Sequence, residues 1–441
     1  MKHHHAPAPT PTTAVDFETV AADLRADADL WNGFVDLCAM GGRMAGSASE
    51  ALAQDWAFER LSAIGPLARR DPTAYAGWRC DHSSLVREPD GQALDAVPLL
   101  GTAFTPEAGL VAPVLNLGRG TPAQIAEAGE AVRGKVVMVA HEYPFSTETV
   151  HRRVKLQAAQ AAGAVGFLIV QPEAGIGPVS GSSGRAGGPG IPAMGISAEA
   201  AQQLDQPGAQ VRLRVRGEDL PGAQTHTLVL DLPAGDGAGA ERVVLSAHLD
   251  GHPLAQSALD NATGVTAVLA IARAMAPHMA RMRRGLTVCL FSAEEWALNG
   301  SREWLRALPD AQRQSIALNV NLDSLDGSPS LTALTSGFSE LGGFAREGAQ
   351  WAGVELGIHL PLMSNSDHAN FANAGIPALR LIAGFNEPES SLRWLLTRAD
   401  TWKLADKARL LRATQASAGV LWHALHAPDL GFLRSSRGTA P

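Results

Sequence analysis

The sequence has few cysteines and little excess charge. Its 441 residues include three cysteines at unrelated spacings, which excludes a disulfide framework and a CxxC metal site. We expect Cys38, Cys80 and Cys289 to be small buried hydrophobic residues. Charged residues make up 18% of the chain and the net charge is −8. This balance favours neither nucleic acid nor a membrane surface as a partner.

Long hydrophobic runs are also absent. No window of about 18 apolar residues without a charge occurs, and this excludes a membrane-spanning helix. The N-terminal MKHHHAPAPTPTTAV has no apolar signal-peptide core. We therefore expect a soluble cytoplasmic protein, or a secreted one if a signal peptide has been removed. Residues 1–15 are expected to be a disordered leader, in which His3–His5 is a tag remnant or a native tract.

The spacing of apolar residues and the frequency of Gly and Pro change twice along the chain. Residues 16–40 and 47–64 carry apolar residues at helical spacing, so two amphipathic helices are predicted, the second capped by Ser47. Residues 96–222 contain short apolar runs punctuated by Gly and Pro, which indicate a small β-rich domain with a βαβ-like unit. Its glycine-rich loop at 174–190 lacks GK[ST] and is predicted to be a flexible surface loop rather than a phosphate cradle.

Residues 223–441 alternate apolar strands with helices. The predicted strands are nearly continuously apolar, as strands covered on both faces should be: 242–247, 286–291, 316–322 and 378–382. The fold class is therefore α/β, a doubly wound and mostly parallel sheet with the small β-rich domain inserted. The predicted parts are a leader (1–15), a helical segment (16–95), the insert (96–222) and the main domain (223–441).

Metal-ligand residue types follow the predicted strands. In open α/β sheets the ligand site lies beyond the carboxyl ends of the strands. There the chain offers His248, Asp250, Asp260, Glu294, Glu295 and Asp323, while Asp367 and His368 come shortly before the last predicted strand. Carboxylates gathered at one edge repel one another unless a cation holds them, and His with Asp or Glu suits zinc. The pattern predicts a hydrolytic site with one or two zinc ions.

The spacing within these segments suggests separate roles. The neighbours Glu294 and Glu295 fit a division in which one ligates metal and the other takes a proton from water. The segment His248-Leu-Asp250 fits a histidine ligand oriented by a carboxylate. We expect His252 to be a loop histidine, because no partner at ligand spacing is visible.

The ordered motifs His-x-Asp, Asp-Asn-Ala-x-Gly, Glu-Glu, Asn-Leu-Asp and Ser-Asp-His resemble the zinc aminopeptidase and glutamate carboxypeptidase family of metallopeptidases. Residues 41–47 look like that family's N-terminal segment, and roughly 96–222 like its inserted protease-associated domain. The resemblance implies that His248 and Asp323 bind one metal, Asp260 bridges two and Glu295 binds the second. It also implies that Glu294 is the general base and that Asp250 orients His248.

The resemblance breaks at Leu396. The family completes its second metal site with the histidine of an H-T-x-x-D-T motif, and the corresponding stretch here is LTRADT (396–401). Leucine cannot ligate a metal, so the chain binds one tight zinc or recruits a substitute. The candidate substitutes are His368, Glu387 and Glu389. The chain's tyrosines, Tyr75 and Tyr143, lie far upstream, so Arg380, Arg393 and Arg398 are candidates for oxyanion or substrate-carboxylate binding.

The resemblance makes peptides or acyl-amino acids the expected substrates and supports three functions. The first is a zinc-dependent exopeptidase, an aminopeptidase or dipeptidase. The second is a carboxypeptidase or amidohydrolase of acyl-amino acids, and the third a non-catalytic homologue that has lost a ligand. Retention of both Glu294 and Glu295 argues against the third, because a dead site has no need of a free carboxylate beside the ligand.

Overall fold

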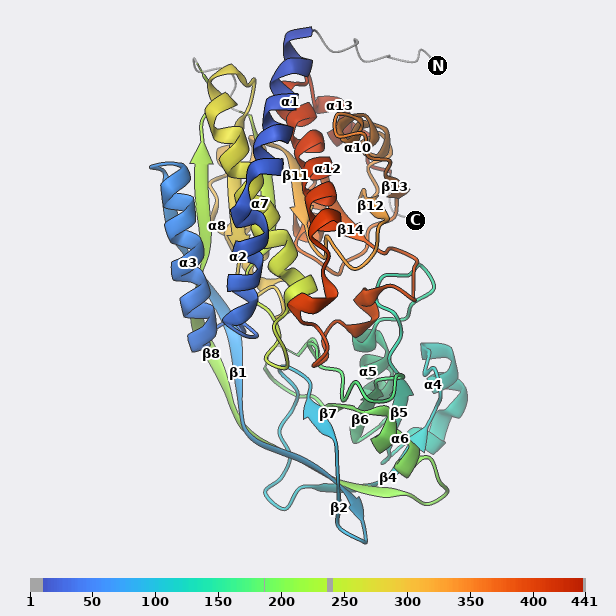
Figure 1. Ribbon diagram of the computed structural model, residues 1–441. Coiled ribbons are helices and arrows are strands. Elements are labelled where there is room, and N and C mark those ends of the chain that lie inside the picture. The colour runs from blue at the N-terminus through green and yellow to red at the C-terminus, as the bar shows by residue number, and fades with distance from the viewer. Residues whose placement is uncertain (1–10, 186, 236–240, 439–441) are drawn as a thin grey trace.

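The computed structural model describes residues 11–185, 187–235 and 241–438. A larger body of helices packed on a sheet lies above a smaller, β-rich body (Figure 1). One connected path of strands runs through both, in the order β13-β12-β14-β11-β9-β10-β8-β4-β5-β6-β7-β3. The polypeptide therefore joins its two bodies through shared sheet hydrogen bonds rather than through a linker.

The sheet of the larger body is mostly parallel. Its centre consists of four mutually parallel strands in the spatial order β14 (Ala378–Ala383), β11 (Ile316–Leu322), β9 (Arg242–His248) and β10 (Gly285–Phe291). Beyond β14 lie β12 (Leu331–Leu334), which is antiparallel to it, and β13 (Gly357–His359). Nearly every residue of the central strands is buried, so the predicted α/β class with strands covered on both faces is confirmed.

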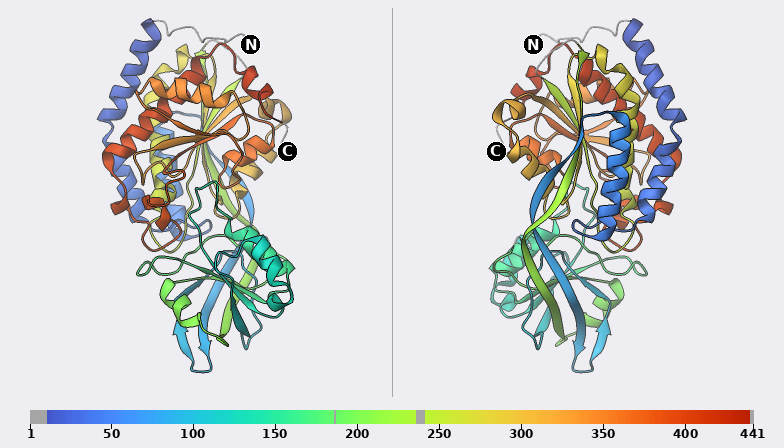
Figure 2. Two further views of the ribbon diagram at one scale, coloured as in Figure 1. Left: turned by 90° about the vertical axis from the view of Figure 1, so that its right-hand side faces the viewer. Right: turned by 90° about the vertical axis from the view of Figure 1, so that its left-hand side faces the viewer.

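Helices cover both faces of this sheet (Figure 2). One face carries α1 (Pro11–Ala26), α2 (Ala28–Ala39), α7 (Thr263–Met275) and α12 (Lys407–His426), which pack on one another. The remaining helices of this body are α3 (Ala48–Ile64), α8 (Asn299–Ala307), α9 (Asp310–Gln314), α10 (Leu341–Gln350), α11 (His368–Asn373) and α13 (Gly431–Ser435). None of the described helices is long and apolar enough to cross a bilayer.

The single helix predicted over 16–40 is wrong, because the chain breaks at Asp27. The Asp27 carboxylate accepts a hydrogen bond from the Asp29 backbone N–H and so begins α2. Ser47 caps α3 as predicted, accepting from the Glu50 backbone N–H. Residues 11–15 of the expected leader form the start of α1, whereas residues 1–10, with His3–His5, lie outside the described residues.

The smaller body is built around a second parallel set of strands. Strands β4 (Leu110–Asn116), β5 (Val136–Ala140), β6 (Gly166–Val170) and β7 (Ala193–Ile196) are parallel neighbours, with β3 (Ala96–Pro98) antiparallel at the edge. Its helices are α4 (Pro122–Ala128), α5 (Arg152–Ala161) and α6 (Ala198–Leu204). The insert thus contains βαβ crossovers around a core of its own.

A long antiparallel ribbon connects the two bodies. Strand β1 (Ala68–Glu88) pairs with β8 (Gln210–Leu232) along its whole length, and β1 also pairs with the short β2 (Gln92–Leu94). Its register shifts between Tyr75 and Ala76 and again between Cys80 and His82. The ribbon runs continuously through both bodies (Figures 1 and 2). The position between residues 222 and 223, where we expect a domain boundary, lies inside β8.

The glycine-rich loop, predicted to lie on the surface, is buried in its middle part. Residues 177–183 are buried, and Gly181 packs so closely on Arg152 that a Cβ there would lie 2.2 Å from the guanidinium carbon. Gly181 also has φ 122°, a conformation that only glycine adopts easily. Gly181 therefore serves close packing, whereas Gly175, Gly187 and Gly188 have open space around them. Cys38 and Cys289 are buried, Cys80 is half-buried, and all three are unpaired.

Arg43, in the segment 41–47, holds the loop after β9. Its guanidinium is fully buried and donates to the backbone carbonyls of Leu249 (3.0 Å), Gln256 (2.7 Å) and Ser257 (2.8 Å). Arg43→Met should therefore lower the free energy of unfolding by at least about 3 kcal/mol, because several buried carbonyls each lose a partner worth about 1–3 kcal/mol. Denaturant unfolding measures this, and Arg133→Met, a change at an exposed arginine, is the control that should leave the midpoint unchanged. Equal midpoints for both variants would contradict the role given to Arg43.

Candidate metal centre

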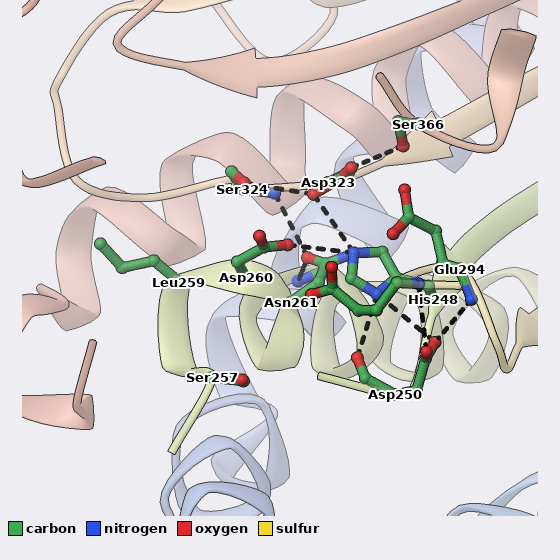
Figure 3. A network of polar contacts seen from close by, with 12 residues as sticks. His248, Asp250, Ser257, Leu259, Asp260, Asn261, Glu294, Asp323, Ser324 and Ser366 are labelled. Carbon is green, nitrogen blue, oxygen red and sulfur yellow. Dashed lines mark hydrogen bonds and ion pairs between the residues drawn. The ribbon is translucent and has the colours of Figure 1, made fainter. Parts of the chain in front are cut away.

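The predicted ligand side chains converge at the carboxyl edge of the central strands. His248 ends β9, Glu294 and Glu295 follow β10, and Asp323 follows β11. Asp260 lies in the turn Ala258–Ala262, directly before α7. Parallel strands present their carboxyl ends together, so residues separated by 75 positions in the sequence meet at one site (Figure 3).

His248 is the centre of this cluster. Its Nε2 lies 3.1 Å from Asp260 Oδ1 and 3.6 Å from Asp323 Oδ1. The ligand atoms of these three residues lie within 4.8 Å of one another, and so do those of His248, Glu294 and Glu295. Nδ1 of His248 donates to the Asp250 backbone carbonyl at 3.0 Å, which leaves Nε2 facing the carboxylates as a ligand requires.

Asp250 organises the acidic segment as well as the histidine. Its carboxylate lies 3.8 Å from His248 Nδ1, farther than its own carbonyl. The carboxylate oxygens accept instead from the backbone N–H groups of Glu294 (3.1 Å) and Glu295 (3.2 Å). Asp250 therefore fixes the start of the loop that presents both glutamates (Figure 3).

Asp323 is held as a carboxylate by its neighbours. Burial would raise its pKa, but Arg380, whose Nη2 lies 3.1 Å from Oδ2, together with His248 and Ser366 holds the pKa below its usual value. Ser366 donates to Oδ2 at 2.5 Å and is itself bonded to Asn321, from which a buried polar chain runs through Ser246 to Asn319. An ionised, fixed Asp323 is ready to accept a cation.

Glu294 has the opposite environment. Burial raises its pKa well above the usual value, and the neighbouring Glu295 carboxylate raises it further, while His248 opposes the shift. A buried carboxylate with a raised pKa is a stronger base than an exposed one, which suits it to taking up a proton.

The segment LTRADT lies against the same site. The Asp400 carboxylate accepts from the backbone N–H groups of Leu259 (2.8 Å) and Asp260 (3.4 Å) and so positions the turn that carries Asp260. Leu396 lines the pocket together with Asp260, Glu294, Glu295 and Asp323. The chain thus keeps the structural part of this segment and has an apolar side chain where the resemblance leads us to expect a ligand.

The smaller body closes the pocket from the other side. His151, Arg152, Arg153 and Ser182 line it. Arg152 is buried, and its Nε donates to the Ser182 carbonyl at 3.1 Å. Among the described residues no carboxylate forms an ion pair with Arg152 or Arg153. Two cationic groups therefore face the pocket with their charges uncompensated by a direct partner.

Other candidates from the sequence lie elsewhere or are engaged. His368 begins α11, is fully buried and belongs to neither of the two groups above. Arg380 lines the pocket, but its guanidinium is engaged by Asp323 and stacks 4.9 Å from the Phe145 ring centroid. Arg398 is exposed and pairs with Asp95, and Arg393 pairs with Glu173.

His252 is a site residue that the sequence did not reveal. Its Nε2 lies 2.6 Å from Glu295 Oε2, and both side chains are buried. Glu295 Oε1 is also buried and has no hydrogen-bond partner among the described residues. An unpartnered buried carboxylate oxygen beside an imidazole fits a metal ligand. The position of His252, four residues after His248, was the available signal.

Known families match both bodies of the chain. Residues 227–421 match Peptidase family M28, and residues 106–204 match the PA domain. Aminopeptidase YwaD of Bacillus subtilis is 25% identical over 331 residues, covering 74% of this chain and 69% of that protein. Leupeptin-inactivating enzyme 1 of Streptomyces exfoliatus is 29% identical over 169 residues, 37% of each chain.

Solved structures share the whole architecture. BSAP, a zinc aminopeptidase from Bacillus subtilis, superimposes with a TM-score of 0.70 at 21% identity, covering 93% of this chain and 95% of that one. A Peptidase M28 precursor from Shewanella amazonensis gives a TM-score of 0.78 at 20% identity, covering 95% and 98%. These likenesses show the fold.

A buried histidine and carboxylate cluster at the strand ends of an α/β sheet is the arrangement expected of a metallohydrolase. The larger body matches Peptidase family M28 over residues 227–421 and the insert matches the PA domain over residues 106–204, which supports a metallopeptidase. The resemblance drawn from the ordered sequence motifs is thereby confirmed.

Zinc should stabilise the folded protein through this cluster. Added to metal-free protein at about 100 times its dissociation constant, zinc should raise the free energy of unfolding by about 2.7 kcal/mol. Asp323→Asn removes a charged ligand with little change of shape and should abolish most of the rise in melting temperature. The control Asp310→Asn, at an exposed residue, should respond as wild type does. An unchanged zinc response in Asp323→Asn would exclude Asp323 as a ligand.

Proposed function

We propose that the protein is a zinc-dependent aminopeptidase acting on peptides. The observation that carries the proposal is the group His248, Asp260 and Asp323, whose ligand atoms lie within 4.8 Å of one another beside the buried Glu294. Imidazole with carboxylates is a donor set that suits zinc. The names of the relatives, an aminopeptidase and a zinc aminopeptidase, support the same activity.

Each residue has a distinct part in hydrolysis. Zinc, when bound, supplies a Lewis acid that polarises the peptide carbonyl and lowers the pKa of water. His248, Asp260 and Asp323 would hold it. Glu294, as a carboxylate, takes a proton from the attacking water and, once protonated, passes it to the leaving amine; its raised pKa makes the carboxylate a stronger base for the first transfer. Asp250 and Asp400 keep the glutamates and the Asp260 turn in place.

Separate variants test the base and the ligand. Glu294→Gln should retain zinc but lose about 10²–10⁴-fold in kcat, because general-base catalysis contributes about that much. Asp260→Asn should lose zinc as well as activity. Metal content after desalting and steady-state kinetics on a leucyl peptide measure both. Equal zinc content and equal residual activity in the two variants would refute this division of roles.

A second candidate activity, on short peptides or acyl-amino acids with a free carboxylate, is favoured by Arg152 and Arg153. Both line the pocket and neither has a carboxylate partner in the described chain. An arginine binds a carboxylate through charge-assisted hydrogen bonds. Such a contact favours a dipeptidase or carboxypeptidase, in which the substrate's terminal carboxylate reaches the PA domain.

A matched substrate pair distinguishes these activities. If Arg153 binds the terminal carboxylate, Arg153→Gln should lower kcat/KM for Leu-Gly by about 10- to 100-fold. This corresponds to the loss of about 1.5–3 kcal/mol for a hydrogen bond to a charged group. The kcat/KM for Leu-Gly-amide, which has no terminal carboxylate, should stay unchanged. Arg133→Gln, at an exposed arginine of the same body, is the control. Equal effects on acid and amide would eliminate the carboxylate contact. Hydrolysis of N-acetyl-leucylglycine would show instead that a free amino terminus is not required.

A further inference from the structure

The pocket contains a second candidate metal position, separate from the one that His248, Asp260 and Asp323 would fill. Asp260 and Glu295 are the carboxylates that the family resemblance assigns to a second metal, and Leu396 lines the same pocket without a donor atom. The Leu396 carbonyl accepts from the Ser180 N–H at 2.7 Å, so its loop is fixed against the PA domain. Two carboxylates alone make an incomplete zinc site, because three protein ligands are usual.

His252 supplies an imidazole beside Glu295. Its Nε2 lies 2.6 Å from Glu295 Oε2, and its side chain is 4% exposed. The other oxygen of Glu295 is buried and unpartnered among the described residues. His252 and Glu295 thus meet in one buried contact, and the charge of Asp260 acts on both side chains.

The backbone and the PA domain fix the orientation of His252. Its N–H donates to Ser257 Oγ at 2.8 Å, and the preceding Gly251 N–H donates to the Arg43 carbonyl at 3.2 Å. Ser180 Oγ of the PA-domain loop lies 3.3 Å from Nδ1. A partner on one ring nitrogen sets the tautomer that leaves the other free to bind metal.

We propose that His252 replaces the histidine missing at position 396 and completes a second zinc site with Asp260 and Glu295. This inference rests on the proposed function, since it concerns the metal content of the same site. It assigns the substitute ligand to a loop only four residues beyond His248, rather than to His368, Glu387 or Glu389. Glu387 bonds to Ser328 and Glu389 is exposed.

The number of zinc ions bound per chain tests directly whether His252 replaces the missing histidine ligand. After loading with zinc and desalting, we expect about two zinc ions per chain in wild type and about one in His252→Ala and in His252→Gln. The double variant His252→Ala/Leu396→His should return towards two, because an imidazole is restored at a position that lines the pocket. His368→Ala and the distant His226→Ala should keep two.

Several outcomes would overturn the inference. They are one zinc in wild type, two zinc ions in a folded His252→Ala, or loss of the second zinc in His368→Ala. Melting curves establish that each variant is folded, and His252→Gln preserves a polar side chain if His252→Ala does not fold. Wild type that binds two zinc ions but cleaves no peptide would refute the proposed function and leave the ligand assignment intact. Wild type that binds one zinc and cleaves peptides would do the reverse.

Discussion

The burial of several carboxylates at one edge of a sheet is the constraint on which the site depends. Asp250, Glu294, Glu295 and Asp323 are nearly inaccessible to solvent, and unpaired buried charges are costly. The protein offsets this cost in different ways. Asp250 accepts from two backbone N–H groups, Asp323 pairs with Arg380, and Glu295 contacts His252. What remains uncompensated is negative charge around His248, and a divalent cation is the partner that neutralises it.

The PA domain is part of this site rather than an appendage. It reaches the pocket with Arg152, Arg153 and Ser182, places Ser180 against His252, and stacks Phe145 on Arg380. The continuous pairing of β1 with β8 limits how far the two bodies can move apart, because separation would break ladder hydrogen bonds. Substrate therefore meets groups from both bodies, and the pocket's positive charges come mainly from the insert.

Leu396 and Asp400 show that the segment LTRADT (396–401) combines two independent roles, a metal-ligand position and a backbone support. Asp400 still braces the turn that carries Asp260, a backbone role that does not depend on what occupies position 396. A ligand position can be vacated if another segment brings a donor to the same volume. In our proposal this segment is the loop 249–257, which Arg43 fixes through its backbone carbonyls.

The sequence by itself determined the sheet class and most of the cluster. Three apolar runs, each followed closely by His, Asp or Glu, place those side chains at one edge, since parallel strands share the direction in which their carboxyl ends point. The break at Asp27 was missed because apolar spacing continues across a capped junction. Strand β1 was missed because its sequence mixes charged and polar residues with single apolar ones, and only four of its residues are buried.

Only the tertiary structure decided which residues from outside those runs join the site. His252 gives only the spacing from His248 as a local signal and the loop 177–183 gives none, because their burial arises from contacts between segments about 70 residues apart. Arg152 and Arg153 enter the pocket only because the β1–β8 ribbon sets the PA domain against the strand ends. Local sequence patterns indicate which residues share a face of one strand or helix. Contacts between the PA domain and the strand ends depend instead on how the two folded bodies pack together.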